Sequence, residues 1–343
     1  MTKKLTAAVI GVGMIGRLHA MAYWQNARTA LVGVVDADFE KAKSVAQEFE
    51  TTAYRSLAEL ISSEHPEVLS VAVREDVRYK IAIEAAKSGA NLLLEKPLAP
   101  NLAEADSLLD EIEKISLNKQ HTVNFVLRAD QRYAEIKQRI DQGALGEICT
   151  VFARRRGTSA GADIYGPWTN LLISTAIHDL DAIMWTTGAT IERVYAESVV
   201  KKCAQWNHED AVVATLKLSN GAIATLETSW VMPPNYYSPL EAQFDVVGTG
   251  GNARITGSNQ GVEIFSESGY SLPELSSWPI HQGKLSGALR NSIDNFIDCV
   301  YFDRKPLITL TEARNAQSVV AALQESLKTG QATNVDLRKR IDK

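Results

Sequence analysis

In the first third of the chain, segments with the apolar pattern of a strand alternate with segments that have the apolar pattern of a helix. Short apolar runs of strand length, several rich in β-branched residues, alternate with longer segments whose apolar residues recur at helical spacing. Alternation of this kind is typical of a parallel, doubly wound sheet with helices on both faces. The pattern predicts strands at residues 5–10, 30–35, 51–54, 68–73, 91–94 and 121–126, and helices after Gly16 and at 39–49, 57–62, 76–88 and 101–115.

The rest of the chain has a different order of elements. A helix, a strand, a loop at 157–170 rich in glycine and aromatic residues, and another helix precede four strand-like segments in succession. Asn220-Gly221 separates two of these segments and is a hairpin signal. Strands joined by short turns predict an α+β domain with a mostly antiparallel, open sheet. The predicted elements are helices 132–142, 171–187, 289–302 and 311–328, and strands 147–156, 193–201, 211–218, 223–231 and 241–247.

Length and composition agree with two domains of an ordinary globular protein. The chain has 343 residues, 45% of them hydrophobic and 22% charged, and we expect domains at 1–125 and 126–343. A net charge of −5 provides no basic field for nucleic acid or an anionic membrane. Three distant cysteines and histidines without HxxxH or HExxH spacing favour neither a disulfide framework nor a metal site.

The N-terminus superficially resembles a signal peptide. Lys3-Lys4, an apolar run and Ala20-Met21-Ala22 imitate its three regions, but three glycines interrupt the apolar run and Arg17 and His19 precede the apparent cleavage site. No apolar run reaches the length that a transmembrane helix needs. We therefore expect a cytoplasmic protein.

The first predicted strand ends in a glycine-spaced turn that predicts dinucleotide binding. Gly11 allows the tight turn, Gly13 lets a pyrophosphate approach the backbone, and Gly16 lets the next helix pack closely. Asp36 ends the second strand, where an acid accepts hydrogen bonds from the adenosine ribose. The predicted cofactor contacts are Gly11, Gly13, Met14, Ile15, Gly16, Asp36, Val73, Arg74, Glu95 and Lys96.

Charge near the second strand favours NAD over NADP. Asp36-Ala37-Asp38 places acids, and no base, where a 2′-phosphate would bind. Arg74 and Arg78 leave the alternative open, because either side chain has the length to reach across.

Two further residues have the chemistry that hydride transfer from a secondary alcohol requires. Lys96 follows a buried strand at the nicotinamide edge of the sheet, where it can hydrogen-bond a substrate hydroxyl; the alternative is a surface lysine paired with Glu95. His178 can accept the hydroxyl proton, with Asp181 on the same helical face; the alternative is a core histidine. Asp179 points elsewhere and is expected to be a solvated charge.

These motifs together resemble the Gfo/Idh/MocA oxidoreductases. The resemblance rests on the glycine turn, Asp36, Glu95-Lys96-Pro97 and His178-Asp179-Leu180-Asp181, and covers nearly the whole chain in order and spacing. It implies a Rossmann domain followed by an α/β domain used for oligomerisation, as a homodimer or homotetramer. It also implies NAD(P)-linked oxidation or reduction of a sugar or cyclitol, with Lys96 on the reacting hydroxyl and His178 as acid–base.

The chain departs from that family in three places. Ser174 stands where many inositol-type relatives have an acid, so His178 is to be oriented by Asp181, Ser174 or substrate. Val73-Arg74-Glu75 and Arg78 replace a Thr-Pro-Asn and a histidine. Trp168-Thr169-Asn170-Leu171 replaces a glycine-rich approach to the histidine helix.

Substrate contacts are expected from polar and aromatic side chains that follow the sixth strand or precede the histidine helix. Aromatic rings over a sugar with polar groups at its rim are a usual arrangement. The alternatives are that the aromatic residues anchor their loop, and that the arginines of residues 154–156 bind an anion or form a solvated strand edge. The candidates are Asn124, Arg128, Arg154, Arg156, Tyr165, Trp168 and Asn170.

Three functions remain in competition. The first is an NAD-dependent dehydrogenase of a cyclitol, sugar or sugar derivative. The second is an NAD-dependent glycosidase or epimerase, in which the hydride is borrowed and returned. The third is a non-catalytic, NAD-binding sugar sensor, which the intact Lys96 and His178 disfavour and Ser174 favours.

Overall fold

The chain folds into two compact units. The computed structural model describes residues 3–116, 118–257, 261–267 and 269–338. The first unit comprises Met1–Val126 and Trp278–Arg314, and the second comprises Leu127–Ser277 and Asn315–Lys343. The sequence prediction placed residues 278–314 in the second domain, so the structure moves one segment to the first.

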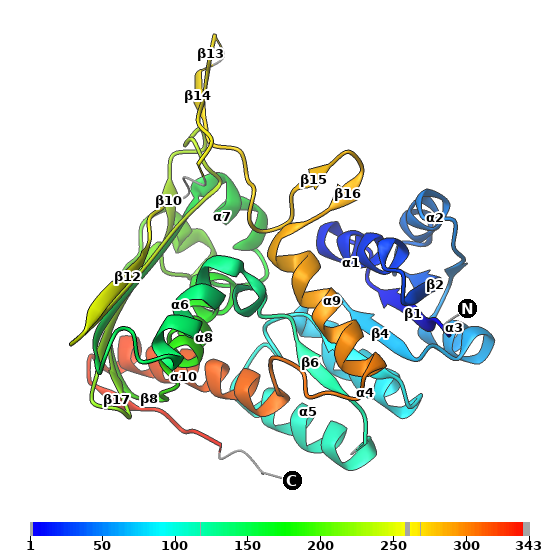
Figure 1. The fold of residues 1–343 in the computed structure, drawn as a ribbon, viewed down its shortest axis with the longest axis horizontal. Helices are drawn as coiled ribbons and strands as arrows, with labels where there is room; N and C mark the ends of the chain where they lie inside the picture. Colours follow the sequence, from blue (N-terminus) through cyan, green and yellow to red (C-terminus); the bar gives the residue numbers. More distant parts are fainter. Residues whose placement is uncertain (1–2, 117, 258–260, 268, 339–343) are drawn as a thin grey trace. The chain divides into compact units, whose positions relative to one another are not determined.

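The first unit contains the predicted parallel sheet (Figure 1). Its six strands lie in the order β3-β2-β1-β4-β5-β6, and each neighbouring pair is parallel. The order reverses beside β1, which pairs with both β2 and β4; ligands of such sheets bind at this point, beyond the carboxyl ends of the strands. The strands are β1 (Leu5–Ile10), β2 (Thr29–Val35), β3 (Ala53–Tyr54), β4 (Val68–Val71), β5 (Asn91–Leu94) and β6 (His121–Val123).

The helices of this unit begin where the sequence provides capping residues. Asp38, Ser56 and Asn101 each accept backbone N–H groups from the first turn of the helix that follows. β6 is shorter than predicted, because the Phe125 N–H turns back to the Val123 carbonyl oxygen at 2.9 Å and a helical turn begins at Val126. The helices are α1 (Met14–Gln25), α2 (Phe39–Glu48), α3 (Leu57–Glu64), α4 (Glu75–Lys87), α5 (Leu102–Ile115) and α9 (Gly287–Tyr301).

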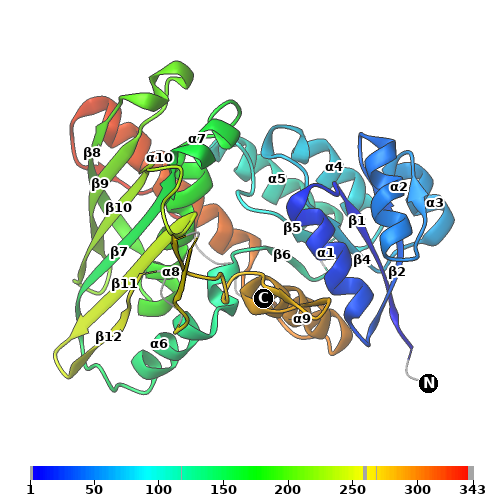
Figure 2. The same cartoon turned by 90° about the horizontal axis from the view of Figure 1, so that it is seen from above.

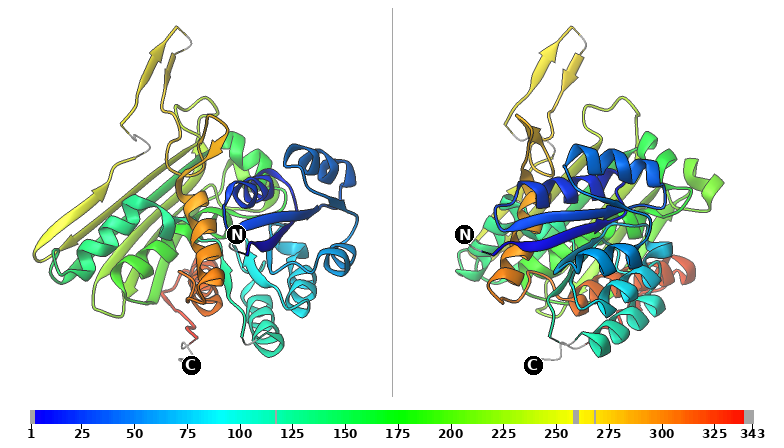
Figure 3. Two further views of the ribbon diagram at one scale, coloured as in Figure 1. Left: turned by 45° about the vertical axis from the view of Figure 1, so that its right-hand side comes forward. Right: turned by 90° about the vertical axis from the view of Figure 1, so that its right-hand side faces the viewer.

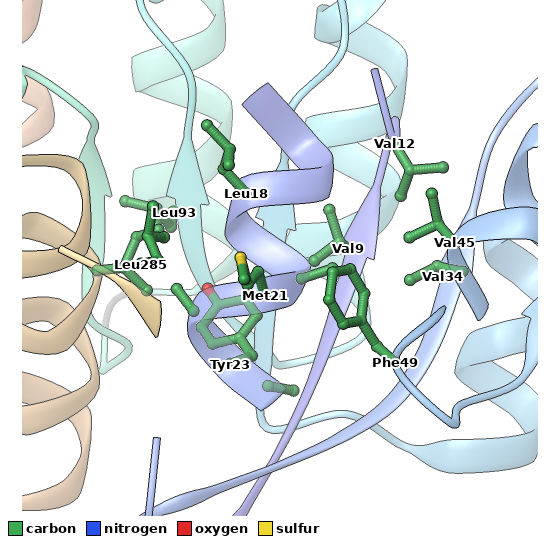
Figure 4. Close-up of a cluster of buried hydrophobic side chains, with 14 of the residues drawn as sticks. Val9, Val12, Leu18, Met21, Tyr23, Val34, Val45, Phe49, Leu93 and Leu285 are labelled. Carbon is green, nitrogen blue, oxygen red and sulfur yellow. The ribbon is translucent and has the colours of Figure 1, made fainter. Parts of the chain in front are cut away.

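Helix α9 belongs to the first unit because its apolar face completes that unit's core (Figure 4). The core contains Val9 of β1, Met21 and Tyr23 of α1, and Phe49 after α2. Leu285, in the hairpin β15–β16 (Ile280–His281 and Lys284–Leu285), packs into the same cluster. Helix α9 adds four buried residues, Leu289, Ile293, Phe296 and Ile297. Helical spacing predicted this apolar face but carried no information about its partner.

The second unit is built on a mixed sheet, which confirms the predicted open, mostly antiparallel arrangement (Figure 2). Its strand order is β12-β11-β7-β10-β9-β8-β17, in which only the pair β7–β10 is parallel among the described strands. Gly221, with φ +89°, forms the expected turn between β9 and β10. The strands are β7 (Ile148–Thr158), β8 (Ile191–Val199), β9 (Ala211–Leu218), β10 (Ile223–Met232), β11 (Leu240–Gly248), β12 (Gly251–Ile255) and β17 (Thr333–Asn334).

Helices α6 and α8 lie on one face of this sheet, and the other face is open (Figures 1 and 2). Residues of β9 and β10 accordingly alternate between buried and accessible positions. A hairpin, β13–β14 (Ile264–Ser266 and Gly269–Ser271), extends from this unit (Figure 3). The helices are α6 (Gln131–Asp141), α7 (Ser159–Tyr165), α8 (Ile177–Thr187) and α10 (Leu310–Thr329), with short helical turns at Val126–Ala129, Leu172–Ala176 and Lys202–Trp206.

Among the described residues, no helix is both long and apolar enough to cross a membrane. No group of three or more His, Cys, Asp or Glu among them is arranged to hold a metal ion.

Candidate functional site

The turn after β1 requires glycine at two of its three glycine positions. Gly11 has a left-handed φ of +83°, and a Cβ there would lie 2.7 Å from the Ala72 carbonyl oxygen. A Cβ on Gly16 would collide with the carbonyl oxygen of Gly11. A Cβ on Gly13 would meet nothing within 4 Å. Packing therefore explains Gly11 and Gly16, whereas Gly13 leaves open space beside the backbone.

The start of α1 offers an anion the groups that a pyrophosphate needs. Gly13 is the N-cap residue, and no described side chain caps the helix. The first-turn N–H groups and the positive end of the helix dipole are therefore available to an anion. Met14, in that turn, exposes 61% of its surface.

Asp36 holds the turn in place from the end of β2. Its Oδ2 accepts the backbone N–H of Val12 at 2.8 Å, and its Oδ1 accepts that of Asp38 at 3.0 Å. Each carboxylate oxygen keeps further acceptor capacity for ribose hydroxyls. The turn, the uncapped helix and this acid fit a dinucleotide cofactor.

The end of β4 departs from the family pattern in a way that the structure explains. Arg78 is 2% exposed and donates to the carbonyl oxygens of Val73, at 2.6 Å, and Pro97. Burial lowers the pKa of Arg78 to about 10, although nearby acids, Glu95 foremost, oppose the shift. Arg78 therefore links the chain after β4 to the turn after β5, whereas Arg74 lies at the surface in an ion pair with Asp76.

Lys96 lies in the turn that leaves β5, at the same edge of the sheet as Gly11. Its side chain is partly buried, its backbone N–H donates to Glu95 Oε2 at 3.2 Å, and its bond to Pro97 is cis. Glu95 is 13% exposed at its side chain. Burial opposes ionisation of this carboxyl, but hydrogen bonds from His19 and Asn124 and the charges around it outweigh burial and lower its pKa.

Glu95 is the centre of a buried polar network. His19 Nε2 lies 3.1 Å from Glu95 Oε1, and Asn124 Nδ2 donates to the same oxygen at 2.6 Å. Behind them, His19 Nδ1 lies 2.9 Å from Ser70 Oγ, and Ser292 Oγ donates to Asn124 Oδ1 at 2.7 Å. The network thereby joins α1, β4, β5, the end of β6 and α9. Asn124, predicted to bind substrate, is 1% exposed and belongs to this network.

His178 is the second residue of α8. The predicted helix 171–187 is interrupted by a π-helical turn at Leu172–Ala176, a feature frequent at functional sites. Trp230 Nε1 donates to Thr175 Oγ1 at 2.8 Å and ties this turn to the sheet. His178 itself is half-buried, and Ser174 lies one helical turn before it.

Two buried ion pairs hold α8 in place. Asp181 accepts three bonds from Arg128 at 2.6–3.2 Å, and Asp179 accepts two from Arg155 at 2.8 and 2.9 Å. Both aspartates are fully buried, so the prediction that Asp179 is a solvated charge is wrong. Because Asp181 is engaged by Arg128, its orientation of His178 stays a prediction.

The remaining substrate candidates have structural partners. Arg154 pairs with Glu241 and Arg156 with Glu227, on the face of the sheet opposite to that of Arg155 and α8. Because β7 lies between β11 and β10, neither arginine is at a strand edge. Both are held in ion pairs on this face, and we leave them out of the proposed substrate site.

The aromatic loop also contains its own contacts. Trp168 Nε1 donates to the Ile164 carbonyl oxygen at 3.2 Å, and its ring meets that of Tyr165 edge to face. Asn170 Oδ1 accepts the N–H of Ile173 at 3.1 Å and so caps the following turn. These contacts agree with the alternative that the loop residues anchor their own segment.

Sequence reasoning did not identify His19, Ser70 or Tyr23 as part of the site. A signal was present, because His19 is a polar residue within a run of α1 residues that pattern analysis reads as apolar and buried. A histidine in such a position needs polar partners, which the structure places in β4 and β5.

Comparison with known proteins identifies relatives of the whole chain. The chain is 25% identical to scyllo-inositol 2-dehydrogenase (NAD(+)) of Bacillus subtilis strain 168 over an alignment of 347 positions, which covers 99% of this chain and 98% of the relative. It is 26% identical to D-glucoside 3-dehydrogenase of Escherichia coli K12, covering 97% of each. Myo-inositol 2-dehydrogenase from Lactobacillus plantarum superposes with a TM-score of 0.86 at 23% identity, covering 97% and 100%.

A family comparison agrees with both halves of the chain. The model of the oxidoreductase family with an NAD-binding Rossmann fold, Gfo/Idh/MocA, matches residues 5–125, and the model of the C-terminal domain of that family matches residues 133–254. With both models matched in order, the chain belongs to the Gfo/Idh/MocA family of NAD-binding oxidoreductases.

Proposed function

We propose that this protein is an NAD-dependent dehydrogenase that oxidises a secondary hydroxyl of a cyclitol, sugar or glycoside. The observation that carries the proposal is the turn Glu95-Lys96-Pro97 at the sheet edge that also presents the glycine turn and Asp36. Relatives named for inositol and glucoside dehydrogenation support the substrate class.

The proposed chemistry needs two side chains. NAD, held by the glycine turn and Asp36, would supply the hydride acceptor. Lys96 donates a hydrogen bond to the reacting oxygen and stabilises the negative charge that develops there. His178 accepts the hydroxyl proton, for which an imidazole suits neutral pH. Because Ser174 stands where an acid would orient the imidazole, we assign that orientation to Ser174, to Asp181 or to bound substrate.

NAD is favoured over NADP by the position of Asp36. A 2′-phosphate at the end of β2 would meet its carboxylate, which already engages the turn. Arg78 was a candidate partner for a 2′-phosphate. Its guanidinium instead donates hydrogen bonds to the carbonyl oxygens of Val73 and Pro97.

One assay series tests the proposal. The purified protein is incubated with NAD or NADP and a panel of inositols, aldoses, glucosides and sugar acids, and reduced cofactor is followed by its absorbance. Net NADH formation is expected. Conversion of a glycoside or epimer without net NADH would indicate the borrowed-hydride reaction instead.

The variant Lys96→Ala separates an enzyme from a sensor. We expect it to bind NAD normally, by calorimetry, and to lose turnover by a factor of roughly 10² to 10⁴. A protein that binds NAD and sugar but turns over none of the panel would overturn the dehydrogenase proposal in favour of a sensor.

We also propose a homo-oligomer, a homodimer or homotetramer, formed through the open face of the second unit's sheet. Side chains on that face include Tyr195, Val213 and Ile223, each at least 40% exposed. Neighbouring ion pairs such as Arg156–Glu227 supply the polar part of such a surface.

A further inference from the structure

The hydrogen bonds around Glu95 have one consistent direction when its carboxylate is ionised and the His19 ring carries a single proton. His19 Nε2 must then carry the proton and donate to Glu95 Oε1, 3.1 Å away. With one proton on the ring, Nδ1 accepts from Ser70 Oγ at 2.9 Å, and Ser70 in turn accepts from the Tyr23 hydroxyl at 2.7 Å. The hydroxyl groups of Tyr23 and Ser70 therefore each donate to one acceptor.

A second branch points at the same oxygen. Ser292 donates to Asn124 Oδ1 at 2.7 Å, which orients the Asn124 amide so that its Nδ2 donates to Glu95 Oε1 at 2.6 Å. The amide orientation is thereby settled by its partners. Two buried side chains, His19 at 0% and Asn124 at 1% exposure, therefore converge on one carboxylate oxygen.

The other oxygen of Glu95 faces the turn that carries Lys96. Glu95 Oε2 accepts the Lys96 backbone N–H at 3.2 Å, and the Lys96 charge contributes to lowering the pKa of Glu95. By the same Coulomb interaction, an ionised Glu95 favours the charged form of Lys96. Anything that moves or neutralises Glu95 therefore acts on the Lys96 ammonium.

We propose that His19 and Asn124 are positioning residues that act on Lys96 through Glu95. Both residues donate hydrogen bonds that fix the Glu95 carboxylate at the end of β5. The carboxylate in turn accepts the backbone N–H of Lys96 and interacts with the charge of its ammonium group. This inference rests on the proposed role of Lys96 in turnover. It adds that helix α1, whose N-terminus offers the anion site, also supports the Lys96 turn.

The matched control is His121, a partly buried histidine of the same unit. His121 opens β6 at the amino-terminal edge of the sheet, where its Nε2 lies 2.7 Å from Ser116 Oγ. Like His19 it has a hydrogen-bonded ring, here partly buried, but it has no contact with Glu95 or Lys96 among the interactions of the described residues. His19→Leu and His121→Leu therefore remove comparable groups, and His19→Gln restores a donor toward Glu95.

The test compares kcat, KM and the primary deuterium isotope effect with the substrate that the wild-type protein oxidises best. For His19→Leu and Asn124→Ala we expect kcat to fall roughly 10- to 100-fold, the loss typical of removing a hydrogen bond to a charged group, with NAD affinity within about threefold of wild type. The isotope effect should rise, because hydride transfer becomes rate-limiting. His19→Gln should recover most of kcat, and His121→Leu should lower thermal stability but leave kcat within about twofold.

A readout independent of turnover accompanies the kinetics. Reductive methylation followed by peptide mass spectrometry measures how fast Lys96 reacts as a function of pH in each variant. We expect Lys96 in Glu95→Gln to react at lower pH than in the wild type, because the neighbouring negative charge is lost. His19→Leu should be intermediate, because the carboxylate is still charged but is no longer held beside the turn.

Several outcomes would overturn the inference. These are equal kcat losses in folded His19→Leu and His121→Leu, an unchanged kcat in both His19→Leu and Asn124→Ala, or a labelling profile of Lys96 that no variant shifts. Should wild type oxidise no substrate while labelling shifts as expected, the proposed function fails and the coupling of His19 to Lys96 stands.

Discussion

At the scale of single residues, several charged side chains make buried contacts that the surrounding sequence does not predict. Arg78 is the clearest case. By sequence it is a charged residue on an amphipathic helix, yet its guanidinium is buried against the carbonyl oxygens of Val73 and Pro97. Its charge supports the two chain segments that border the proposed nicotinamide site.

Replacing Arg78 should therefore destabilise the protein. Arg78→Leu leaves two buried carbonyl groups without their donor, and we expect a loss of about 2–4 kcal/mol in the free energy of unfolding. Arg74→Leu, which removes an exposed ion pair in the same segment, should change it by less than about 0.5 kcal/mol. Denaturant titration of the two variants measures both values, and equal losses would contradict this assignment.

His121 makes the stability depend on acid. Burial lowers its pKa from 6.5 to about 4, and the Leu92 N–H directed at Nδ1, 3.3 Å away, also favours the neutral ring. The unfolded chain takes up this proton near pH 6.5 and the folded chain only near pH 4. The stabilisation is therefore full above about pH 6.5 and is lost as pH falls toward 4, by about 3 kcal/mol.

The variant His121→Gln isolates this effect. Its stability should fall less steeply between pH 6.5 and pH 4 than that of the wild type, measured by denaturation at a series of pH values. His281→Gln, which removes an exposed histidine, should leave the slope unchanged. Parallel slopes for wild type and His121→Gln would refute the assignment.

At the scale of elements, buried charge pairs determine where α8 lies on its sheet. Arg155 is 6% exposed and Asp179 is fully buried, so each charge relies on the other for its solvation. Asp181 and Arg128 repeat the arrangement between α8 and the turn at Val126–Ala129. Replacing one residue of a pair should therefore lower the free energy of unfolding more than replacing both residues.

A double-mutant comparison tests the pair Arg155–Asp179. Asp179→Leu alone should lower the free energy of unfolding by about 3–5 kcal/mol, because a buried guanidinium is left without its counter-charge. Adding Arg155→Met should restore most of that loss. If the double variant is as unstable as the single one, side-chain packing, and not the balance of charges, keeps α8 in place.

At the scale of the whole molecule, the proposed oligomer is open to direct measurement. Val213 and Ile223 are 51% and 45% exposed on the open face of the sheet. Val213→Asp combined with Ile223→Asp should reduce the mass found by light scattering to that of one chain, because buried carboxylates oppose association. The exposed variant Val77→Asp, in α4, should leave the mass unchanged.

Periodicity predicted most of the elements, because it depends on neighbours a few residues apart. The six strands of the first unit, the glycine turn and Asp36 could all be located in this way. Partners far apart in sequence could not, because no local pattern relates His19 to Glu95 or Arg155 to Asp179. The π-helical turn before His178 and the packing of α9 likewise depend on tertiary contacts.

The return of residues 278–314 to the first unit means that the polypeptide passes between the two units three times. Cleavage of the chain at one position therefore cannot separate either unit as a complete fragment. A fragment ending near residue 126 would lack the four apolar side chains that α9 presents to α1, and water would reach Met21 and Tyr23. Anyone who wishes to study nucleotide binding by the isolated first unit should graft α9 back through a short linker.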